Sequence, residues 1–401
     1  MNTPKMFTKP FTQQEPVSEE AIQRVSDILR SGRLHRYNIQ GNEQPEATLL
    51  EEDYAAWQGS KYCVAVTSGG QALQIALRAA GVTAGTPVLA NAYTLAPVPG
   101  AIFATGGRPI LVEIDDNWHT DIADLRLKAQ QSGAKIFLLS HMRGHIADMD
   151  AVLELCNEFG ITLIEDCAHT MGARWQGKRS GNFGHVACFS AQTYKHINSG
   201  EGGLLTTDDP ELAARSVICS GSYMLYAKHG ARPDEEIFRK VRLDNPNCSA
   251  RLDNVRAALM RAQLAGLEEN IRRWNARYSV FQTGFKKIAH CFVPDRADHE
   301  EYVGSSFQFQ LPGLDRQQIP ALVAACGDRG VEIKWFGADE PVGFTSRFDS
   351  WGYLGTPPDL PQTKRVLSNT CDIRVPLTFD EQDCALIVAI VAEEVERLTS
   401  T

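Results

Sequence analysis

Short apolar runs rich in branched residues alternate along the chain with stretches of helical periodicity, and this alternation most strongly constrains the fold. Helices are predicted over Gln71–Ala80, Asp148–Phe159 and Asp253–Lys287. Strands are predicted at Tyr62–Thr67, Pro87–Ala90, Pro109–Ile114, Lys135–Ser140, Thr162–Asp166, His185–Phe189 and Gly203–Thr206. Strands that alternate with helices form parallel sheets with crossover helices. We therefore expect an α/β fold with a mostly parallel central sheet flanked by helices.

The pattern changes near residue 290, where a smaller α+β domain is predicted. Strands at Ser305–Leu311 and Val331–Trp335 surround a helix near Gln317–Arg329, and a last helix runs from Asp380 to Leu398. The long helix that starts at Asp253 would connect the two parts. We expect a large domain over residues 1–265, which includes the N-terminal segment, and a small domain over residues 266–401.

Composition excludes several classes of protein. The 401 residues carry a net charge of -9, which argues against nucleic acid or an anionic membrane as the main partner. The ten cysteines are scattered singly, without the spacing of a disulfide framework or a zinc site. The N-terminus lacks the apolar core of a signal peptide, and no apolar run reaches membrane-spanning length. These features predict a reduced, cytoplasmic protein.

Two residues suggest covalent chemistry. Lys195 lies between a buried-type strand ending at Phe189 and the glycine-rich turn Ser199–Gly203, which is an unusual place for a solvated lysine. A fixed, partly desolvated lysine has a lowered pKa and can attack a carbonyl. Asp166 ends an apolar strand, where open α/β sheets place ligands and where a pyridinium nitrogen would find its partner. Together they suggest a pyridoxal phosphate enzyme.

A strand–turn–helix segment could bind the phosphate of that cofactor. The turn Ser68-Gly69-Gly70 presents free amides at a helix N-terminus, although a serine-capped turn without a ligand has the same sequence. Ser190, at the end of a strand, could donate to a phosphate or cap a turn. His169 could contact a cofactor oxygen or satisfy a buried carbonyl, and spacing alone leaves both readings open.

Longer blocks resemble one family. Glu165-Asp-Cys-Ala-His169 with Gly172-Ala173, the stretch from Phe189 through Lys195 to Gly203, and Arg374-Val-Pro-Leu377 are similar to the DegT/StrS family of pyridoxal phosphate-dependent aminotransferases of fold type I. The resemblance covers nearly the whole chain. It implies that Lys195 forms the Schiff base with the cofactor and moves the proton, that Asp166 pairs with the pyridine nitrogen, and that His169 contacts the phenolic oxygen.

The resemblance also assigns the phosphate and the partner. Ser190, Ser68 and the amides of Gly69 and Gly70 would hold the phosphate, in a homodimer whose active site is shared between the subunits. The chain departs from the family at three positions and therefore resembles an atypical branch. Gly70 stands where a hydroxyl residue is usual, Leu95 where an aromatic residue stacks on the cofactor, and Ser249 where an asparagine reaches the partner's phosphate. Tyr93 is a nearby residue that could take the place of Leu95. Asn247 lies two residues before Ser249, and Ser249 could still donate to the partner's phosphate.

The predicted function is transfer of an amino group from L-glutamate, or glutamine, to a keto or aldehydo sugar that is nucleotide-linked. The mechanism would be ping-pong through the pyridoxamine form of the cofactor. One alternative is a non-nucleotide acceptor such as a free keto sugar acid, a cyclitol or an amino-shikimate-type ring. Others are dehydration on the same cofactor, which the intact Lys195 disfavours, and a catalytically silent regulator.

Two groups of side chains are candidates for substrate binding. Trp335 and Phe336 could form an aromatic wall for a ring substrate, and core packing explains them equally well. Loop residues that could bind the donor carboxylate are Arg33, His35, Arg36, His229, Arg232 and Arg347.

Overall fold

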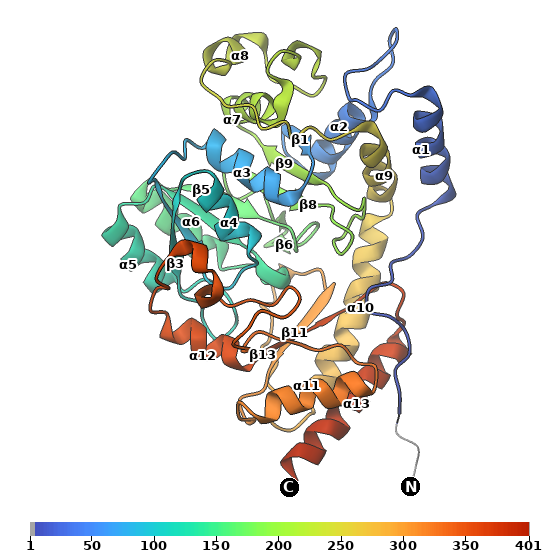
Figure 1. Ribbon diagram of the computed structural model, residues 1–401, viewed down its shortest axis with the longest axis vertical. Helices are drawn as coiled ribbons and strands as arrows, with labels where there is room; N and C mark the ends of the chain where they lie inside the picture. Colours follow the sequence, from blue (N-terminus) through green and yellow to red (C-terminus); the bar gives the residue numbers. More distant parts are fainter. Residues whose placement is uncertain (1–4, 401) are drawn as a thin grey trace.

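The computed structural model describes residues 5–400 and contains three sheets with helices packed around them (Figure 1). The helices are α1 (Glu19–Ser31), α2 (Glu46–Gln58), α3 (Gly69–Ala79), α4 (Pro97–Ala104), α5 (Ile122–Ser132), α6 (Met149–Phe159), α7 (Pro210–Val217), α8 (Glu235–Val241), α9 (Asn254–Leu264), α10 (Leu267–Phe285), α11 (Gln318–Asp328), α12 (Pro361–Asn369) and α13 (Glu381–Thr399). Short 3₁₀ segments include η1 (Met142–Gly144).

The central sheet has seven strands in the order β1-β9-β8-β5-β4-β2-β3. They are β1 (Tyr62–Val66), β2 (Pro87–Asn91), β3 (Arg108–Val112), β4 (Ile136–Ser140), β5 (Thr162–Asp166), β8 (Val186–Ser190) and β9 (Gly203–Thr207). Six of them run in one direction, and β9 pairs antiparallel with both β8 and β1. The predicted mostly parallel sheet is confirmed. Its antiparallel member, β9, follows β8 through residues 191–202, which form turns and no helix, and this loop carries Lys195.

Helices cover both faces of the central sheet, because alternate residues of each strand point to opposite sides. Cys63 and Ala65 of β1 pack with one apolar cluster, which includes residues of α2, α5, α6 and α9. Val64 and Val66 pack with another, which includes residues of α3, α4, α7 and α8. The strands are buried on both sides, which explains why the sequence shows continuous apolar runs instead of alternation.

Local sequence signals fix the ends of several helices. Asp121, Asp148 and Asp209 precede α5, α6 and α7, and each side chain accepts hydrogen bonds from backbone N–H groups of the first turn. Asp380 and Asp383 form a reciprocal capping box at the start of α13. These caps orient the crossover helices against the sheet.

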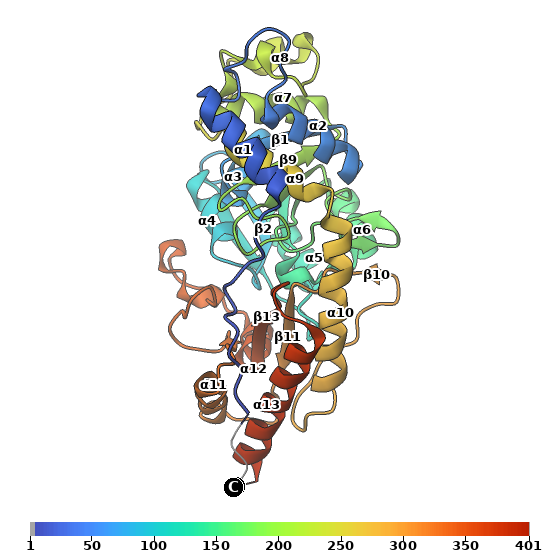
Figure 2. The ribbon, with the colours of Figure 1, turned by 90° about the vertical axis from the view of Figure 1, so that its right-hand side faces the viewer.

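A second sheet, in the order β11-β13-β12, forms the centre of the C-terminal part. Its strands are β11 (Ser306–Gln310), β12 (Lys334–Trp335) and β13 (Thr370–Arg374), all antiparallel. They share an apolar core with α10, α11 and α13. Phe7 and Phe11 also pack into this core, and the N-terminal segment descends beside the C-terminal helices in both ribbon views (Figures 1 and 2). The predicted domain boundary at residue 265 stays a prediction.

Three details of the sequence prediction were wrong. The helix expected over Asp253–Lys287 is two helices, because the chain leaves helical hydrogen bonding at Ala265 and Gly266. The strand expected at Val331–Trp335 is reduced to Lys334–Trp335. The central strand β13 was not predicted. A third small sheet joins β6 (Arg174–Trp175), β7 (Lys178–Arg179) and β10 (Glu300–Glu301).

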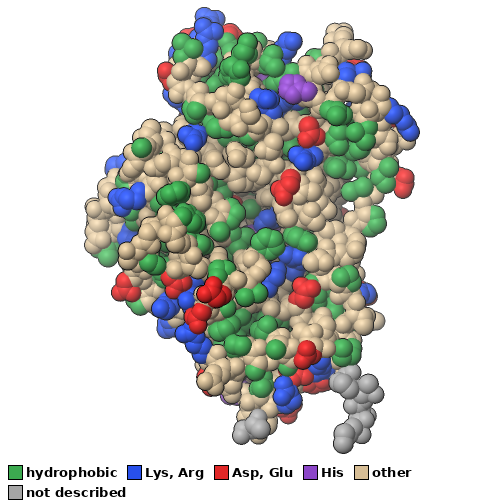
Figure 3. Space-filling view, viewed as in Figure 1, with side chains coloured by type: hydrophobic (Ala, Val, Ile, Leu, Met, Phe, Trp, Pro, Cys, Tyr) green, Lys and Arg blue, Asp and Glu red, His purple; other side chains and the backbone are tan. Residues whose placement is uncertain are grey.

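The helices and the surface charges bear on which partners the protein could have. Over residues 5–400, none of the helices combines the length and the apolar character that a membrane crossing requires. On the face drawn in Figure 3, acidic and basic side chains are interspersed.

Candidate active site

A cavity of about 560 Å³ lies at the carboxyl ends of β4, β5 and β8. Eight of the nine residues predicted for the site line it: Ser68, Gly69, Gly70, Leu95, Asp166, His169, Ser190 and Lys195. Asp166 and Ser190 are the last residues of their strands, and Ser68 follows β1 by two residues. Parallel strands bring their carboxyl ends to one edge of the sheet, so residues more than 120 positions apart meet in one cavity.

Asp166 is held by two hydrogen bonds. Ser140, its register partner at the end of β4, donates from Oγ to Oδ2 at 2.9 Å. The backbone N–H of Ala168 donates to Oδ1 at 3.2 Å. The carboxylate is buried and lines the cavity. It is therefore fixed in orientation and can accept a further hydrogen bond from a ligand.

Lys195 and His169 form the reacting end of the cavity. Lys195 Nζ lies 2.7 Å from His169 Nε2, and the backbone N–H of Arg143 donates to His169 Nδ1 at 3.2 Å. Because Nδ1 accepts, the proton of a neutral imidazole is on Nε2, and it points at the lysine nitrogen. Burial, which is the largest effect, and the charge of Arg143 lower the pKa of Lys195 to about 7. Burial, and then the charge of Lys195, also hold the pKa of His169 well below its usual range. The pair fits a neutral amine that accepts from a neutral imidazole.

The turn before α3 forms a small cradle with Ser190. Ser68 Oγ accepts from the N–H of Gln71 at 3.1 Å, and Ser190 Oγ accepts from the N–H of Gln192 at 3.3 Å. Each hydroxyl therefore keeps its own proton for a ligand. A methyl group on Gly69 would lie 2.8 Å from Cβ of Ser190, whereas one on Gly70 would meet nothing closer than 3.9 Å. Gly69 permits the close approach of α3, and Gly70 leaves open space.

The residues considered for contact with a cofactor or substrate ring are Leu95, Tyr93, Trp335 and Phe336, and only Leu95 lines the cavity. Leu95 lines the cavity, whereas Tyr93 is buried in a cluster with Phe336, and the two rings meet edge to face at 5.2 Å. Tyr93 is therefore a core residue and does not take the place of Leu95. Phe336 is also core, and Trp335 donates from its indole nitrogen to Ser368 O at 2.8 Å. Neither residue lines the cavity, so of the two readings that the sequence left open the structure favours core packing.

Aromatic walls of the cavity come instead from Tyr194, Phe344 and Trp351. The last two lie in the segment between β12 and α12, which contains only two short 3₁₀ turns. Residues 339–364, which include most of this segment, are rich in Gly, Pro and aromatic residues. This composition is typical of an ordered loop, but it does not indicate which of its residues face the cavity.

Ser249 lies outside the chain's own cavity. It has a left-handed backbone with φ of 50°, and its N–H donates to Oδ1 of Asn247 at 2.9 Å. The neighbouring Arg251 donates to the carbonyl of Gly221. The proposed contact of Ser249 with a second copy of the chain stays a prediction.

None of the six predicted donor-carboxylate residues lines the cavity within the described part of the chain. Arg36 is fully buried and pairs with Glu51 at 2.6 and 2.8 Å, and Arg347 pairs with Asp349 at 3.0 Å. The arginines that do line the cavity are Arg143 and Arg374. Arg374 begins one of the sequence blocks that carry the family resemblance, and this was the available signal for it.

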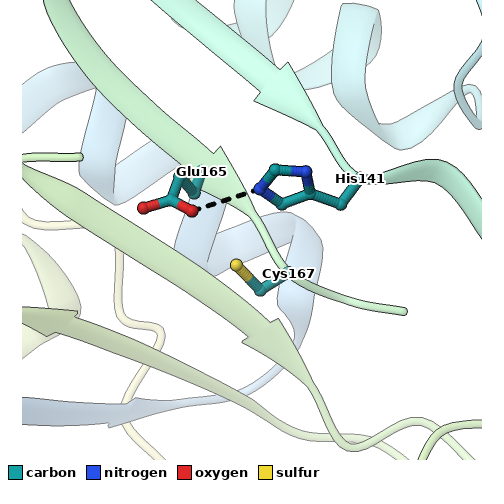
Figure 4. Close-up of side chains that lie close together, drawn as sticks. All are labelled: His141, Glu165 and Cys167. Atoms are coloured by element: carbon teal, nitrogen blue, oxygen red, sulfur yellow. Dashed lines mark hydrogen bonds and ion pairs between the residues drawn. The ribbon is translucent and has the colours of Figure 1, made fainter. Parts of the chain in front are cut away.

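Glu165, next to Asp166, points to the other side of β5 and acts as a structural hub. Its carboxylate accepts backbone N–H groups of Gly181, Phe183 and Gly184 at 2.9, 2.8 and 2.6 Å. His141 Nε2 lies 3.1 Å away, and Cys167 is close by (Figure 4). These contacts lower the pKa of Glu165 against the effect of its burial. The occupied oxygens leave little capacity for a metal ion, although the three side chains are close together.

Comparison with known proteins defines the class. The model of the DegT/DnrJ/EryC1/StrS aminotransferase family matches residues 16–392. The chain therefore belongs to this family and is a transaminase. The resemblance seen in the sequence is confirmed.

Three known proteins illustrate the similarity. The 3-amino-5-hydroxybenzoate synthase of Amycolatopsis mediterranei is 31% identical over 314 residues, which are 78% of this chain and 77% of the relative. The dTDP-3-amino-3,4,6-trideoxy-alpha-D-glucose transaminase of Streptomyces venezuelae is 34% identical over 267 residues, 66% of this chain and 64% of the relative. A crystal structure of 3-amino-5-hydroxybenzoic acid synthase superposes with a TM-score of 0.80 at 26% identity, over 98% of this chain and 100% of that one.

Proposed function

We propose that the protein transfers an amino group from L-glutamate, or glutamine, to a keto or aldehydo sugar that is nucleotide-linked, with pyridoxal phosphate as cofactor. The observation that carries the proposal is the convergence of Lys195, with its pKa of about 7, and the fixed Asp166 carboxylate in one cavity. A lysine with a substantial neutral fraction near pH 7 and a carboxylate at a strand end are what a pyridine aldehyde requires.

The donor set of the cavity fits the phosphate as well as the ring. Ser68 and Ser190 each keep a hydroxyl proton, and the amides of Gly69 and Gly70 are at the N-terminus of α3, where negative charge is stabilised. Asp166 would accept from the ring nitrogen, and Leu95 would cover the ring by dispersion. When bound, the cofactor supplies an aldehyde for the amino group and an electron sink for the adjacent carbon.

The chain's own residues divide the remaining work. Lys195 Nζ, as a neutral amine, would take the proton from the α-carbon of the donor and later return one to the carbon of the acceptor. His169 stays neutral because burial lowers its pKa, so its Nε2–H can donate without adding a second charge beside the lysine. The backbone N–H of Arg143 holds the imidazole in this tautomer.

We also propose a homodimer in which Ser249 contacts the cofactor phosphate bound by a second copy. The support is the family resemblance and the position of Ser249, outside its own cavity, in a strained turn stabilised by Asn247. Left-handed backbone at a residue other than glycine is uncommon and concentrates at functional positions.

A second candidate is an acceptor without a nucleotide, such as a free sugar acid, a cyclitol or an amino-shikimate-type ring. It is favoured by the similarity, in sequence and in structure, to 3-amino-5-hydroxybenzoate synthases. The transaminase chemistry and its residues are the same in both candidates.

An absorbance spectrum tests the proposal. Protein incubated with pyridoxal phosphate should show a visible band near roughly 410–430 nm, a general property of this cofactor on lysine, and L-glutamate should bleach it. Lys195→Ala should lack the band and the turnover while it keeps the fold by circular dichroism. A wild-type protein that shows no band after incubation would refute the proposed cofactor chemistry. A Lys195→Ala variant with more than trace turnover would refute the role of the lysine.

A further inference from the structure

We propose that Arg143 and Arg374 form a subsite for a substrate carboxylate, beside the reacting amine of Lys195. Both arginines line the cavity, and they come from different sheets. Arg143 lies in η1 after β4 of the central sheet, and Arg374 is the last residue of β13 in the C-terminal sheet. The subsite deepens the proposed function and rests on it.

Arg143 is buried, and its guanidinium is poorly satisfied. Its side chain is 9% exposed, and its partner is the fully buried Asp372, with Nη2 3.2 Å from Oδ2. Within residues 5–400, neither Nε nor Nη2 makes a hydrogen bond of good geometry. A buried guanidinium normally uses most of its five donors, because unpaired donors are costly. These two nitrogens are themselves inaccessible, so the cavity wall holds a buried guanidinium with one weak pairing, and an anionic ligand in the cavity would stabilise its charge.

The backbone of Arg143 directs it to the reacting end. The residue adopts a left-handed conformation with φ of 56° and ψ of 23°. Its N–H donates to His169 Nδ1, and His169 in turn contacts Lys195. Arg143 is therefore close enough for its charge to lower the pKa of both His169 and Lys195, which a surface arginine would not do.

Arg374 presents a second guanidinium with a fixed plane. Its Cζ lies 3.7 Å from the ring centre of Tyr194, which also lines the cavity. A guanidinium presents its donors as a planar fork that matches the two oxygens of a carboxylate. No carboxylate of the described residues lies within 4.0 Å of Arg374. Its position and its stacking both favour an anionic ligand.

Several cations lie around the buried Asp372. Arg143 and Arg374 are near one shared carboxylate, Asp372, whose other oxygen accepts from Gln308 Nε2 at 2.6 Å. Burial and the charge of Arg143 lower the pKa of Arg374. Lys334, on the neighbouring strand, is near the same acid. Asp372 is the acid that these three cations share, while Asp166 and Glu201 line other parts of the cavity. A ligand carboxylate would add negative charge beside the two arginines.

The cofactor phosphate would not fill this role, because its proposed donors are Ser68, Ser190 and the N-terminus of α3. The subsite is instead beside Lys195, where the substrate reacts. The carboxylate can come from the amino acid donor or from an acid group on the acceptor ring. Two non-reacting probes separate these sources: glutarate stands for the donor chain, and D-glucuronate for a ring acid.

Calorimetric titration of the pyridoxal phosphate-loaded protein tests the subsite without turnover. Arg143→Gln and Arg374→Gln should each weaken binding of at least one probe by about 10- to 100-fold, the usual effect of losing a charged hydrogen-bonding partner. Glutaramide and D-glucose, which lack the charge, should bind weakly to every variant. Arg126→Gln is the matched control, since Arg126 pairs with Glu158 on the surface at 2.5 Å. Arg143→Lys keeps the positive charge but lacks the two parallel donors of the guanidinium, so it should lose less binding affinity than Arg143→Gln.

The outcomes identify the source or reject the subsite. An effect on glutarate alone assigns the subsite to the donor, and an effect on D-glucuronate alone assigns it to the acceptor. Binding that is undetectable for both acids at millimolar concentration, or unchanged in both glutamine variants, would overturn the inference. The visible absorbance band reports separately on the proposed function, because its absence in the wild type would reject the cofactor and not the arginines.

Discussion

Replacing Lys195 by methionine should stabilise the cofactor-free protein while it destroys the transaminase activity. In the folded chain, burial and neighbouring cations lower the pKa of Lys195 from 10.5 to about 7. In the unfolded chain the same amine titrates near 10.5. At pH 7 the Lys195 amine is fully protonated in the unfolded chain, whereas in the folded chain it is partly deprotonated or is charged in a buried site. This difference lowers the free energy of unfolding.

The size of the cost follows from the two pKa values. Each pKa unit corresponds to about 1.4 kcal/mol. The lowered pKa of Lys195 therefore reduces the free energy of unfolding by roughly 4–5 kcal/mol at pH 7 and below. Methionine has a similar length and no charge, but it loses the contact with His169, which is worth about 1 kcal/mol. We expect a net stabilisation of about 2–4 kcal/mol at pH 7. Between pH 7 and 10.5 the unfolded state binds more protons, so the stability of the wild type rises and the difference closes.

Thermal denaturation of the cofactor-free proteins from pH 6.5 to 10 measures this effect. The wild type should gain stability across the range relative to Lys195→Met, and the two should converge near pH 10. Lys364→Met, at an exposed position of α12, should follow the wild type at every pH. A methionine variant at position 195 that is no more stable than the wild type at pH 7, with the same dependence on pH, would refute the depressed pKa.

The remaining predictions concern the phosphate cradle and the structural hub. Gly70→Ser should slow the loss of pyridoxal phosphate during dialysis, because the open space admits a hydroxyl donor; retention equal to the wild type would contradict this. Gly69→Ala should weaken cofactor retention at least tenfold, because its methyl group meets Ser190. Glu165→Gln should lower stability by about 2–4 kcal/mol at pH 7, because the N–H of Gly181 loses its acceptor, and the loss should shrink as the pH falls below 4.5. Zinc added to the wild type should not raise its melting temperature.

Residues at strand ends were predictable from the sequence. Asp166 ends a continuous apolar run, and Lys195 precedes a glycine-rich turn, so each carried a local signal that the sheet topology then brings together. The helix at Asp253–Lys287 shows the limit of periodicity. Its apolar pattern continues across Ala265 and Gly266, and the break depends on backbone freedom that the pattern does not record.

Other site residues lacked such signals. Arg374 lies at the end of β13, whose sequence Thr-Cys-Asp-Ile-Arg includes the buried Asp372. A carboxylate in the middle of a short segment argues against a buried strand. Its burial is tolerable because Asp372 pairs with Arg143 and accepts a hydrogen bond from Gln308. Arg143 owes its direction to a left-handed backbone, which residues other than glycine seldom adopt.

The cavity is built from two kinds of segment, the ends of sheet strands and a loop, and these differ in how freely their residues can change during evolution. Asp166 and Ser190 end the buried strands β5 and β8, and Lys195 follows β8, so substitutions around them disturb a shared core. Phe344 and Trp351 belong to a loop between β12 and α12 that lacks regular hydrogen bonding along most of its length. Insertions and exchanges in such loops cost little stability. A descendant of this chain could therefore acquire a new acceptor by altering the loop alone and inherit its chemistry unchanged.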